Sequence, residues 1–373
     1  MKFTISSTAL YAKLTAASKV LAAKNSMPIL ECFLLDIKNG NVEITASDGE
    51  KYFITRIPLV DSDNNAKLCI NAKQLMDSMK ELAEQPVTLE YNPENYDVRV
   101  QHQSGEFHVI AYDAATYPVQ QPLSNETTEL NLKGETMLNG INDCLFATAN
   151  EEVRMVMTGV FMDVQPDHVV FAGTDGRKLV RYINRDVQTG QATGVILPKK
   201  VSMILRNVLQ KDDELKIRFD AERALIQTAA FEFSFRLIEG RYPNYNSVIP
   251  ANNPFQATVD RATLLSALKR VSVFCNQSSG LMKLHLENNN MTLSGQDNDY
   301  VTSVQENLIC EYNEMPTSIG FSCHLMIDIV SVMDCERVTI QLGDPSRPGV
   351  IVPAEQKENE ELLMLLMPMM LND

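Results

Sequence analysis

The stretch VVFAGTDGRKLVRYI, residues 169–183, holds two apolar runs joined by an Asp-Gly turn. Asp-Gly is a strong tight-turn signal, and the β-branched and aromatic residues beside it favour strands, so the stretch predicts a β-hairpin. The same plan occurs in VEITASDGEKYFITRI, residues 42–57, and in MTLSGQDNDYVTSVQ, residues 291–305. The turn residues Asp48, Asp175 and Asp297 lie 127 and 122 residues apart, which indicates one unit in three copies.

Other landmarks recur at nearly the same spacing. A strand and an amphipathic helix are expected before each hairpin and a strand–helix–strand segment after it, where Ile70, Ile196 and Phe321 lie 126 and 125 residues apart. The segments TYPVQQP and RYPNYNSVIP place Tyr117 and Tyr242 125 residues apart. A period this long is typical of duplicated domains, because solenoid repeats have about 20–50 residues. We therefore predict three domains, residues 1–124, 125–252 and 253–373.

Each copy is expected to hold two helices and about eight strands. Segments such as VEITAS and FEFSFRLI alternate with the period of a strand, and Asn71 with Gln74 has the spacing of a helix N-terminal cap. Apolar side chains recur at helical spacing in three expected helices: Leu10, Leu14, Ala17 and Leu21; Val201, Ile204 and Val208; and Leu325, Ile329 and Val332. The predicted class is α+β, with helices on one face of antiparallel sheets.

The composition excludes several classes of protein. The apolar run LLMLLMPMML, residues 362–371, is about half as long as a membrane-spanning helix and contains a proline. No signal peptide is recognised at the N-terminus, and seven cysteines without CxxC spacing favour reduced thiols, so we expect a cytoplasmic protein. The formal net charge of −15 argues against a nucleic-acid binder, unless the basic residues gather on one surface.

The basic residues are concentrated in the expected helices. Helices at residues 8–24, 199–211 and 260–274 carry net charges of +3, +4 and +2. Those at residues 72–84, 135–149 and 323–335 carry −1, −2 and −2, so the six together carry +4 and the rest of the chain −19. Solvated helix faces often carry lysine, which is one interpretation. The other is that the helices line a surface that binds DNA through its phosphates, without sequence preference.

No signature of catalysis stands out. The sequence contains no GxGxxG, P-loop, HExxH or GxSxG motif. DSDNNA, residues 61–66, begins like a calcium loop but has alanine where the glycine is required. One aspartate per repeat at the same turn is better explained by turn chemistry than by a carboxylate cluster. An enzyme is therefore the weaker class, and no metal or cofactor is expected.

Taken together, the residues closely resemble the family of bacterial sliding clamps, the β subunits of DNA polymerase III. The resemblance covers nearly the whole chain and is carried by MKFTIS, MPILECFLL, GTDGRKL, EGRYPNYNSVIP and the terminal MPMML. It implies three clamp domains per chain and a ring-shaped, head-to-tail homodimer with helices lining the hole. Such a ring encircles duplex DNA and tethers the replicative polymerase, conferring processivity, and it catalyses nothing itself.

The resemblance also gives the apolar tail a role. In this family, short linear motifs of polymerases, the clamp loader and repair proteins bind a hydrophobic pocket between the second and third domains. Carried over by motif, the pocket would comprise Met157, Thr174, Gly176, Arg177, Leu179, Pro243, Val248, Leu325, Leu365, Met367, Pro368, Met369 and Leu371. Methionine side chains adapt to different partners. A plain core strand is the alternative, and we expect residues 362–366 mainly to pack and residues 367–371 mainly to bind.

Two further sets of residues follow from the resemblance. Those matching DNA contacts are Lys24, Lys73, Arg154, Lys199 and Lys200. At the joint between subunits, Phe107 of the first domain would face Val273 and Phe274 of the third.

The chain departs from the family pattern at several places. Met370 and Ser247 stand where the family pattern has basic residues, so the rim of the pocket is expected to be less basic. Glu151 replaces an uncharged polar residue near the DNA-contact positions, and the second helix of the third copy is acidic. Asn372 and Asp373 extend the tail by two residues.

Two hypotheses compete with the ring. The chain could be a monomeric three-domain scaffold that binds peptides without encircling DNA, or an enzyme of unrecognised type. The oligomeric state separates the ring from the monomeric scaffold, and turnover would be needed for an enzyme.

Overall fold

A computed structural model describes residues 1–22, 24–25, 27–150, 152–297 and 300–371. The chain divides into two compact units, Met1–Glu135 with Met203–Leu237, and Thr136–Ser202 with Ile238–Asp373. The second predicted domain is thus shared between the units, and the boundaries at residues 124 and 252 remain predictions. Glu151, Asn372 and Asp373 lie outside the described residues. None of the helices within the described ranges is long and apolar enough to cross a membrane.

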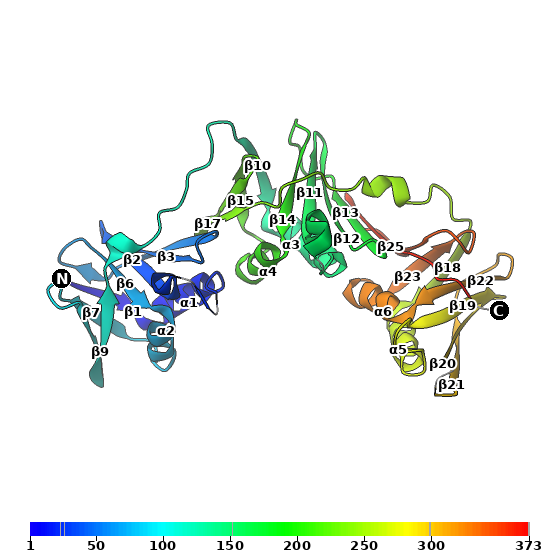
Figure 1. Cartoon of the computed structure of the whole chain (residues 1–373), viewed down its shortest axis with the longest axis horizontal. Coiled ribbons are helices and arrows are strands. Elements are labelled where there is room, and N and C mark those ends of the chain that lie inside the picture. The colour runs from blue at the N-terminus through cyan, green and yellow to red at the C-terminus, as the bar shows by residue number, and fades with distance from the viewer. Residues whose placement is uncertain (23, 26, 151, 298–299, 372–373) are drawn as a thin grey trace. The chain divides into compact units, whose positions relative to one another are not determined.

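The first unit is built on a 13-stranded antiparallel sheet in the order β10-β15-β16-β17-β4-β3-β2-β6-β9-β8-β7-β1-β5 (Figure 1). The strands of the first copy are β1 (Lys2–Ser6), β2 (Cys32–Lys38), β3 (Asn41–Ser47), β4 (Tyr52–Pro58), β5 (Asp61–Ser62), β6 (Ala66–Asn71), β7 (Pro86–Tyr91), β8 (Asp97–His102) and β9 (Gly105–Tyr112). The second copy contributes β10 (Thr128–Lys133), β15 (Glu214–Phe219), β16 (Arg223–Gln227) and β17 (Phe231–Arg236). Helices α1 (Ser7–Ser18) and α2 (Ala72–Lys80) contact each other, and α1 packs on β3 and β4.

The second unit contains an eight-stranded sheet, β14-β11-β12-β13-β25-β24-β23-β18, and a four-stranded sheet, β21-β20-β19-β22. Its second-copy strands are β11 (Gly159–Gln165), β12 (His168–Thr174), β13 (Lys178–Asn184) and β14 (Thr193–Pro198). Its third-copy strands are β18 (Phe255–Asp260), β19 (Leu281–Glu287), β20 (Asn290–Asp297), β21 (Thr302–Ile309), β22 (Thr317–Ser322), β23 (Arg337–Leu342), β24 (Gly349–Pro353) and β25 (Glu360–Leu366). The remaining helices of the chain are α3 (Gly134–Cys144), α4 (Lys199–Val208), α5 (Arg261–Ser272) and α6 (Cys323–Val332).

This arrangement confirms the predicted α+β class with two helices per copy. Polar side chains start the helices, since Ser6, Asn71 and Asp260 accept hydrogen bonds from backbone N–H groups three residues on, at 3.1, 3.1 and 2.7 Å. Such caps are each worth about 1 kcal/mol. The predicted cap at Asn71 is thereby confirmed.

The first helix is shorter than predicted. It was expected over residues 8–24 but ends at Ser18, where Lys19, Val20 and Leu21 bond to carbonyls three residues earlier. This tighter 3₁₀ turn rotates the chain, so Val20 is buried where the helical period predicted Leu21. Lys19 and Lys24 therefore do not belong to the helix, and Lys24 is an exposed residue of the following segment.

The buried face of α6 also differs from the prediction. Ile329 is buried as expected, but Leu325 and Val332 are only partly buried. Met326, Val330 and Met333 fill the core instead. Because α6 is apolar on more than one side, spacing alone could not identify the face that packs.

The hairpin turns have the predicted structural chemistry. Asp175 Oδ1 accepts hydrogen bonds from the backbone N–H groups of Arg177 and Lys178 at 2.8 and 2.9 Å. Asp48 Oδ1 accepts equivalent bonds from Glu50 and Lys51 at 3.1 and 2.9 Å. These aspartates hold the turn closed, as expected from the sequence.

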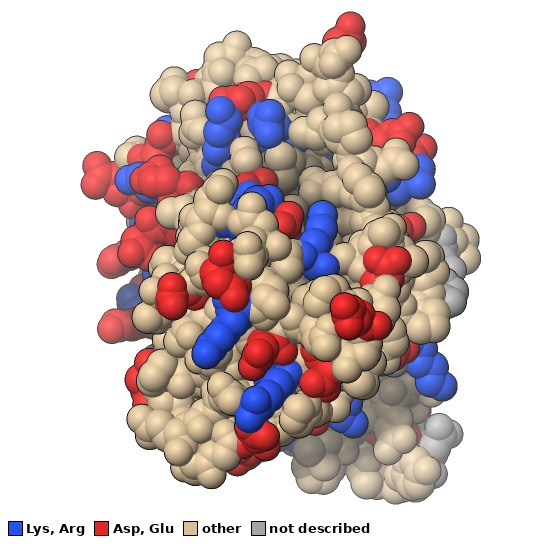
Figure 2. Space-filling model, turned by 90° about the vertical axis from the view of Figure 1, so that its left-hand side faces the viewer, with Lys and Arg blue, Asp and Glu red and all other residues tan. Residues whose placement is uncertain are grey.

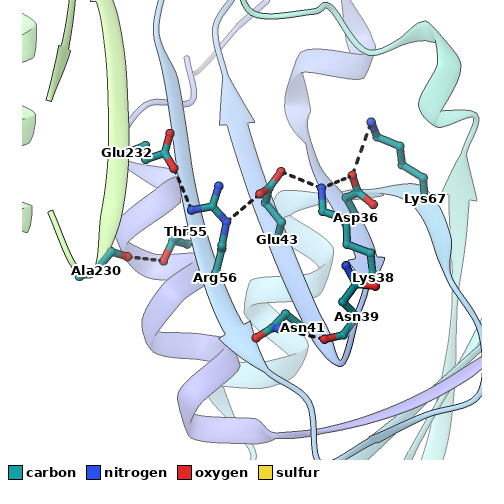
Figure 3. A network of polar contacts seen from close by, with 10 residues as sticks. All are labelled: Asp36, Lys38, Asn39, Asn41, Glu43, Thr55, Arg56, Lys67, Ala230 and Glu232. Atoms are coloured by element: carbon teal, nitrogen blue, oxygen red, sulfur yellow. Dashed lines mark hydrogen bonds and ion pairs between the residues drawn. The ribbon is translucent and has the colours of Figure 1, made fainter. Parts of the chain in front are cut away.

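The first and second copies are joined by pairing of β4 with β17. On the buried face, the ring of Phe53 lies 4.9 Å from that of Phe231 and 5.9 Å from that of Phe233. Thr55, also buried, donates its Oγ1 hydrogen to the carbonyl of Ala230. On the exposed face, Arg56 bridges Glu43 and Glu232 at 2.8 Å each (Figure 3). Exposed ion pairs contribute about 0–1 kcal/mol, so the aromatic contacts and the backbone ladder are the main adhesion.

The second and third copies are joined in the same way, by pairing of β13 with β25 over seven residue pairs. Tyr182, Val180 and Met364 are fully buried there. Arg181 pairs with Glu361 across the two strands, and Arg185 pairs with the same carboxylate at 2.8 Å. The sheet thus continues from one copy into the next at both internal joints.

Near this second joint, Asp143 of α3 is a half-buried carboxyl group. Burial raises its pKa to about 7, an effect that Lys357 opposes and that Glu360 and Asp334 reinforce. An unfolded aspartate has a pKa of about 3.9, so the folded chain binds more protons between these two values. The free energy of unfolding should therefore fall as the pH rises from about 4 to about 7.

We expect Asp143→Asn to remove this penalty, because the amide needs no charge in the buried site. The variant should melt at a higher temperature than the wild type at pH 8 and at about the same temperature at pH 4.5. Thermal unfolding followed by circular dichroism at both values measures this, with Asp186→Asn as the control. A variant destabilised at pH 8 would contradict the effect.

Candidate functional site

The C-terminal tail is held by two backbone hydrogen bonds. After β25, Met367 N donates to the carbonyl of Arg177 at 2.9 Å, and Met369 N donates to that of Gly320 at 2.8 Å. The tail thus leaves β13 of the second copy and reaches β22 of the third. Pro368 stands between the two bonds, where no donor is required.

The floor beneath the tail is an apolar cluster. Leu179 and Leu365 are buried together with Tyr242 and Tyr245, and the ring of Phe161 stacks on Tyr242 at 4.7 Å. The hydroxyl of Tyr245 donates to Asp163 at 2.7 Å, so this buried ring has a polar partner. The repeated Tyr-Pro segment therefore anchors the connection after β17 onto the second-copy sheet.

The β12–β13 turn forms one edge of the site. Gly176 has φ of +86°, and a Cβ there would lie 3.0 Å from Arg154 Nη1 and 3.8 Å from Met157 Cε. Glycine thus permits both the left-handed backbone and the approach of Arg154. Burial opposes the charge of Asp175, but the N–H groups of Lys178 and Arg177 and the Lys178 ammonium hold its pKa below the ordinary value.

The predicted pocket residues all lie in the second unit, around this tail and turn. Those that are buried are Met157, Thr174, Leu179 and Leu365. Those that are exposed are Gly176, Arg177, Pro243, Val248 and Met367, and those that are partly buried are Leu325, Pro368, Met369 and Leu371. We call the thirteen the tail surface. Its composition fits an apolar peptide, with buried side chains as floor and exposed ones as contacts.

Neighbouring residues escaped the sequence analysis. Val153 and Met155, on either side of Arg154, are exposed apolar side chains. Phe161 and Tyr245 support the floor. The apolar run VRMVM at residues 153–157 was the available signal for the first pair, and the repeated Tyr-Pro segment for the supporting rings.

The predicted DNA-contact residues divide between the two units. Lys24 and Lys73 belong to the first, and Arg154, Lys199 and Lys200 belong to the second. Lys24, Lys73, Arg154 and Lys200 are exposed and form no ion pair within the described part of the chain. Lys199 Nζ donates to Asn150 Oδ1 at 2.7 Å. These cations are therefore available to phosphates.

The six helices, taken with the bounds that the structure gives them, differ in net charge. Helices α4 and α5 each carry +3 and α1 and α2 each +1, whereas α3 and α6 carry −2 and −1. Figure 2 shows a face on which Lys and Arg lie among Asp and Glu, so charges of both signs alternate there instead of forming one basic patch. The excess of positive charge is a property of four helices.

The predicted joint residues are apolar and accessible. Phe107 lies on β9 in the first unit and is partly buried, with its ring 6.1 Å from that of His102. Val273 and Phe274 follow α5 in the second unit and are exposed. Exposed apolar groups at a strand edge and a helix end are typical of protein interfaces.

Comparison with known proteins gives one consistent family. Residues 1–121, 131–244 and 246–370 match the models of the N-terminal, central and C-terminal domains of the DNA polymerase III beta subunit. The beta sliding clamp of Synechococcus elongatus is 27% identical over 95% of this chain and 96% of its own. That of Escherichia coli is 24% identical over the full length of both.

Solved structures agree in fold. The beta subunit from DNA polymerase of Streptococcus pyogenes superposes with a TM-score of 0.93 at 22% identity, covering both chains completely. A sliding clamp of Pseudomonas aeruginosa bound to griselimycin also gives 0.93, at 23% identity and full coverage of both.

We expect Gly320→Ala to detach the tail, because an added Cβ would overlap the carbonyl oxygen of Met369 and lie 3.0 Å from Leu371 Cδ2. Amide hydrogen exchange at Met369 should become about fivefold faster, as the loss of one hydrogen bond of about 1 kcal/mol predicts. Gly105→Ala is the control, since its Cβ would meet nothing closer than 3.8 Å. Unchanged exchange at Met369 would show that the tail does not depend on this approach.

Proposed function

The chain belongs to the DNA polymerase III beta subunit family, and we propose that it acts as a sliding clamp. In this proposal two copies join head to tail as a homodimeric ring around duplex DNA and tether the replicative polymerase. The observation that carries the proposal is one kind of strand pairing, which occurs at both internal joints. The two strand edges that would form a third such joint, one in the first copy and one in the third, are open in the ranges that the structure describes.

The two internal joints have the same register. At each joint, the strand after the hairpin turn of one copy pairs with the last strand of the next. The residue opposite Phe233 is Phe53, and the residue opposite Met364 is Val180. Phe53 and Val180 are equivalent, since each pairs in its hairpin with the residue two positions before the turn aspartate, Ala46 or Gly173.

The third copy offers the corresponding residue on its own hairpin strand. Gly295, two positions before Asp297, pairs with Val304 of β21. Strand β21 lies at the edge of the four-stranded sheet, so its outer side has no partner in the described residues. Val304 is thus the third counterpart of Phe53 and Val180.

The first copy offers the complementary last strand. The last strand of each copy pairs with the strand before it through equivalent residues: Phe107 with Val100, Phe233 with Ile226, and Met364 with Ile351. Phe107 of β9 is therefore the counterpart of Phe233 and Met364. On the side of β9 away from β8, the described residues show pairing with β6 only at Ala111 and Tyr112. The edge of residues 105–110 is therefore open on that side.

The proposed joint continues this pattern between subunits. Phe107 would lie opposite Val304 of the partner subunit, in the register of the internal joints. Two copies joined in this way pair both sets of open edges, which is how sheets avoid uncontrolled association. Val273 and Phe274, at the end of the helix that packs on β21, would be covered as well.

The remaining parts of the proposal follow from the site. The basic helices would face the duplex and contact phosphates through Lys24, Lys73, Arg154, Lys199 and Lys200, which carries no sequence preference. The tail surface would bind short motifs of the polymerase, the clamp loader and repair proteins. Its exposed Met367 and Val248, with the neighbouring Met370, suit apolar side chains, and methionine adapts to several partners.

The proposed role is non-catalytic and lies in the cytoplasm, where the chromosome is replicated. A monomeric peptide-binding scaffold is disfavoured, because it would leave the two matching strand edges and the apolar side chains beside them exposed to water.

Retention on circular DNA tests the ring. Protein loaded by its clamp loader on a nicked plasmid should co-elute with the plasmid in gel filtration and be released when a restriction enzyme linearises it. Phe274→Asp should give monomers in sedimentation and no retention, while Met315→Asp, at an exposed residue of another loop, should behave as the wild type. Retention that survives linearisation would refute topological binding.

Charge reversal on α4 tests the DNA surface. Lys199→Glu with Lys200→Glu should weaken DNA binding equally for all sequences, and the slope of log affinity against log salt should fall by about two. Fluorescence anisotropy at several salt concentrations measures both quantities. Lys67→Glu with Lys216→Glu, on strands β6 and β15, is the matched control and should change neither. Equal losses in both double variants would contradict a specific helical surface.

A further inference from the structure

Two exposed apolar side chains on β9 have no role in the features described above. Ile110 and Tyr112 are 56% and 49% exposed, on the outer face of the strand, where Glu106 and His108 precede them. Outward residues of a strand are normally polar. An adjacent apolar pair beside an open edge therefore indicates a surface that another group covers.

The repeat identifies the counterparts of these residues in the third copy. Counted from Phe107 and Met364, Ile110 corresponds to Met367 and Tyr112 to Met369. The hydrogen bonds agree, since Tyr112 pairs with Cys69 of β6 as Met369 pairs with Gly320 of β22. Ile110 and Tyr112 are thus the first-copy equivalents of the methionines in the tail surface.

At the internal joint, the counterpart of Ile110 contacts a hairpin turn. Met367 N donates to the carbonyl of Arg177, a residue of the β12–β13 turn. The N–H of Ala111 donates to Tyr96 on the β8 side. In a strand, the preceding N–H points to the opposite side, so that of Ile110 faces the open edge. In the proposed joint Phe107 lies opposite Val304 of the partner subunit, and in antiparallel strands one number rises as the other falls. Three residues further along, Ile110 therefore lies opposite Val301 of the partner subunit.

The β20–β21 hairpin is longer than its two counterparts. Its last pair joins Asp297 to Thr302, whereas the other hairpins end one pair earlier, before the turn aspartate. Its turn exposes Tyr300 and Val301, at 72% and 91%. Val301 has φ of +54°, a conformation that costs a β-branched residue free energy. An exposed, strained valine at a turn indicates that its side chain is used.

We propose that Tyr300 and Val301 at this hairpin tip pack on Ile110 and Tyr112 of the partner subunit, forming an apolar clasp at each subunit joint. This inference rests on the proposed function, since it requires the head-to-tail dimer. At the subunit joint, the clasp would thus lie at the position that corresponds to the tail surface at the joint between the second and third copies. We assign this surface to a second copy of the chain because the register of the proposed joint places the open N–H of Ile110 opposite Val301 at the hairpin tip.

Engineered disulfides test the clasp and the joint separately. His108→Cys with Ser303→Cys reports the joint, and Ile110→Cys with Val301→Cys reports the clasp, because residues opposite each other in paired strands lie within disulfide range. Oxidation with diamide should give a covalent dimer on a non-reducing gel for both pairs. Val119→Cys with Val301→Cys is the control and should give none, as should the wild type, whose cysteines are all buried or half-buried.

The outcomes distinguish the two claims. Crosslinking of both pairs supports the clasp. Crosslinking of the His108 and Ser303 pair alone overturns the clasp and leaves the dimer standing. Absence of both crosslinks overturns the clasp together with the proposed joint.

A single substitution gives an independent measurement. Val301→Gly removes the side chain but suits the positive φ, so the monomer should be at least as stable as the wild type. The dimer dissociation constant should nevertheless rise about tenfold or more, since both joints of a ring lose the buried valine. Val119→Gly is the control. An unchanged dissociation constant for Val301→Gly would refute the clasp.

Discussion

The structure depends on one interaction, the antiparallel pairing between the hairpin strand of one copy and the last strand of the next. It occurs between β4 and β17 and between β13 and β25, in the same register. A backbone ladder adds hydrogen bonds at every second residue and leaves no open edge between copies. The joint therefore tolerates different side chains, since Phe53 and Phe233 at the first joint correspond to Val180 and Met364 at the second.

The same pairing creates the tail surface. At the end of each last strand, the chain leaves the neighbouring copy and bonds to a strand of its own copy, as Met369 does to Gly320. The β12–β13 turn of the second copy lies beside this part of the tail. Gly176 in that turn leaves room for the side chain of Arg154. The joint thus places buried and exposed apolar side chains together at its end. In the proposed function, the methionines at residues 367, 369 and 370 would let this surface accept different peptides.

The sequence predicted the features that depend on neighbouring residues. The aspartate turns at Asp48 and Asp175, the cap at Asn71 and the two helices per copy follow from local spacing and were confirmed. The end of α1 was not predicted, because the 3₁₀ turn at Lys19 keeps an apolar residue inward at a different position. The packed face of α6 was missed because its helix is apolar on several sides. The pairing of Leu365 with Leu179 joins residues 186 positions apart, and no local pattern encodes such a register.

A net charge of −15 is compatible with the proposed binding of DNA when retention is topological. A protein that holds the duplex by affinity alone needs many phosphate contacts. The proposed closed ring would need only enough positive charge to centre the duplex, and α4 and α5, with +3 each, would supply it. In the proposed ring, the acidic remainder would repel DNA that approaches it. Under the proposed function, retention would not depend on tight electrostatic binding, so a strongly basic chain is not required.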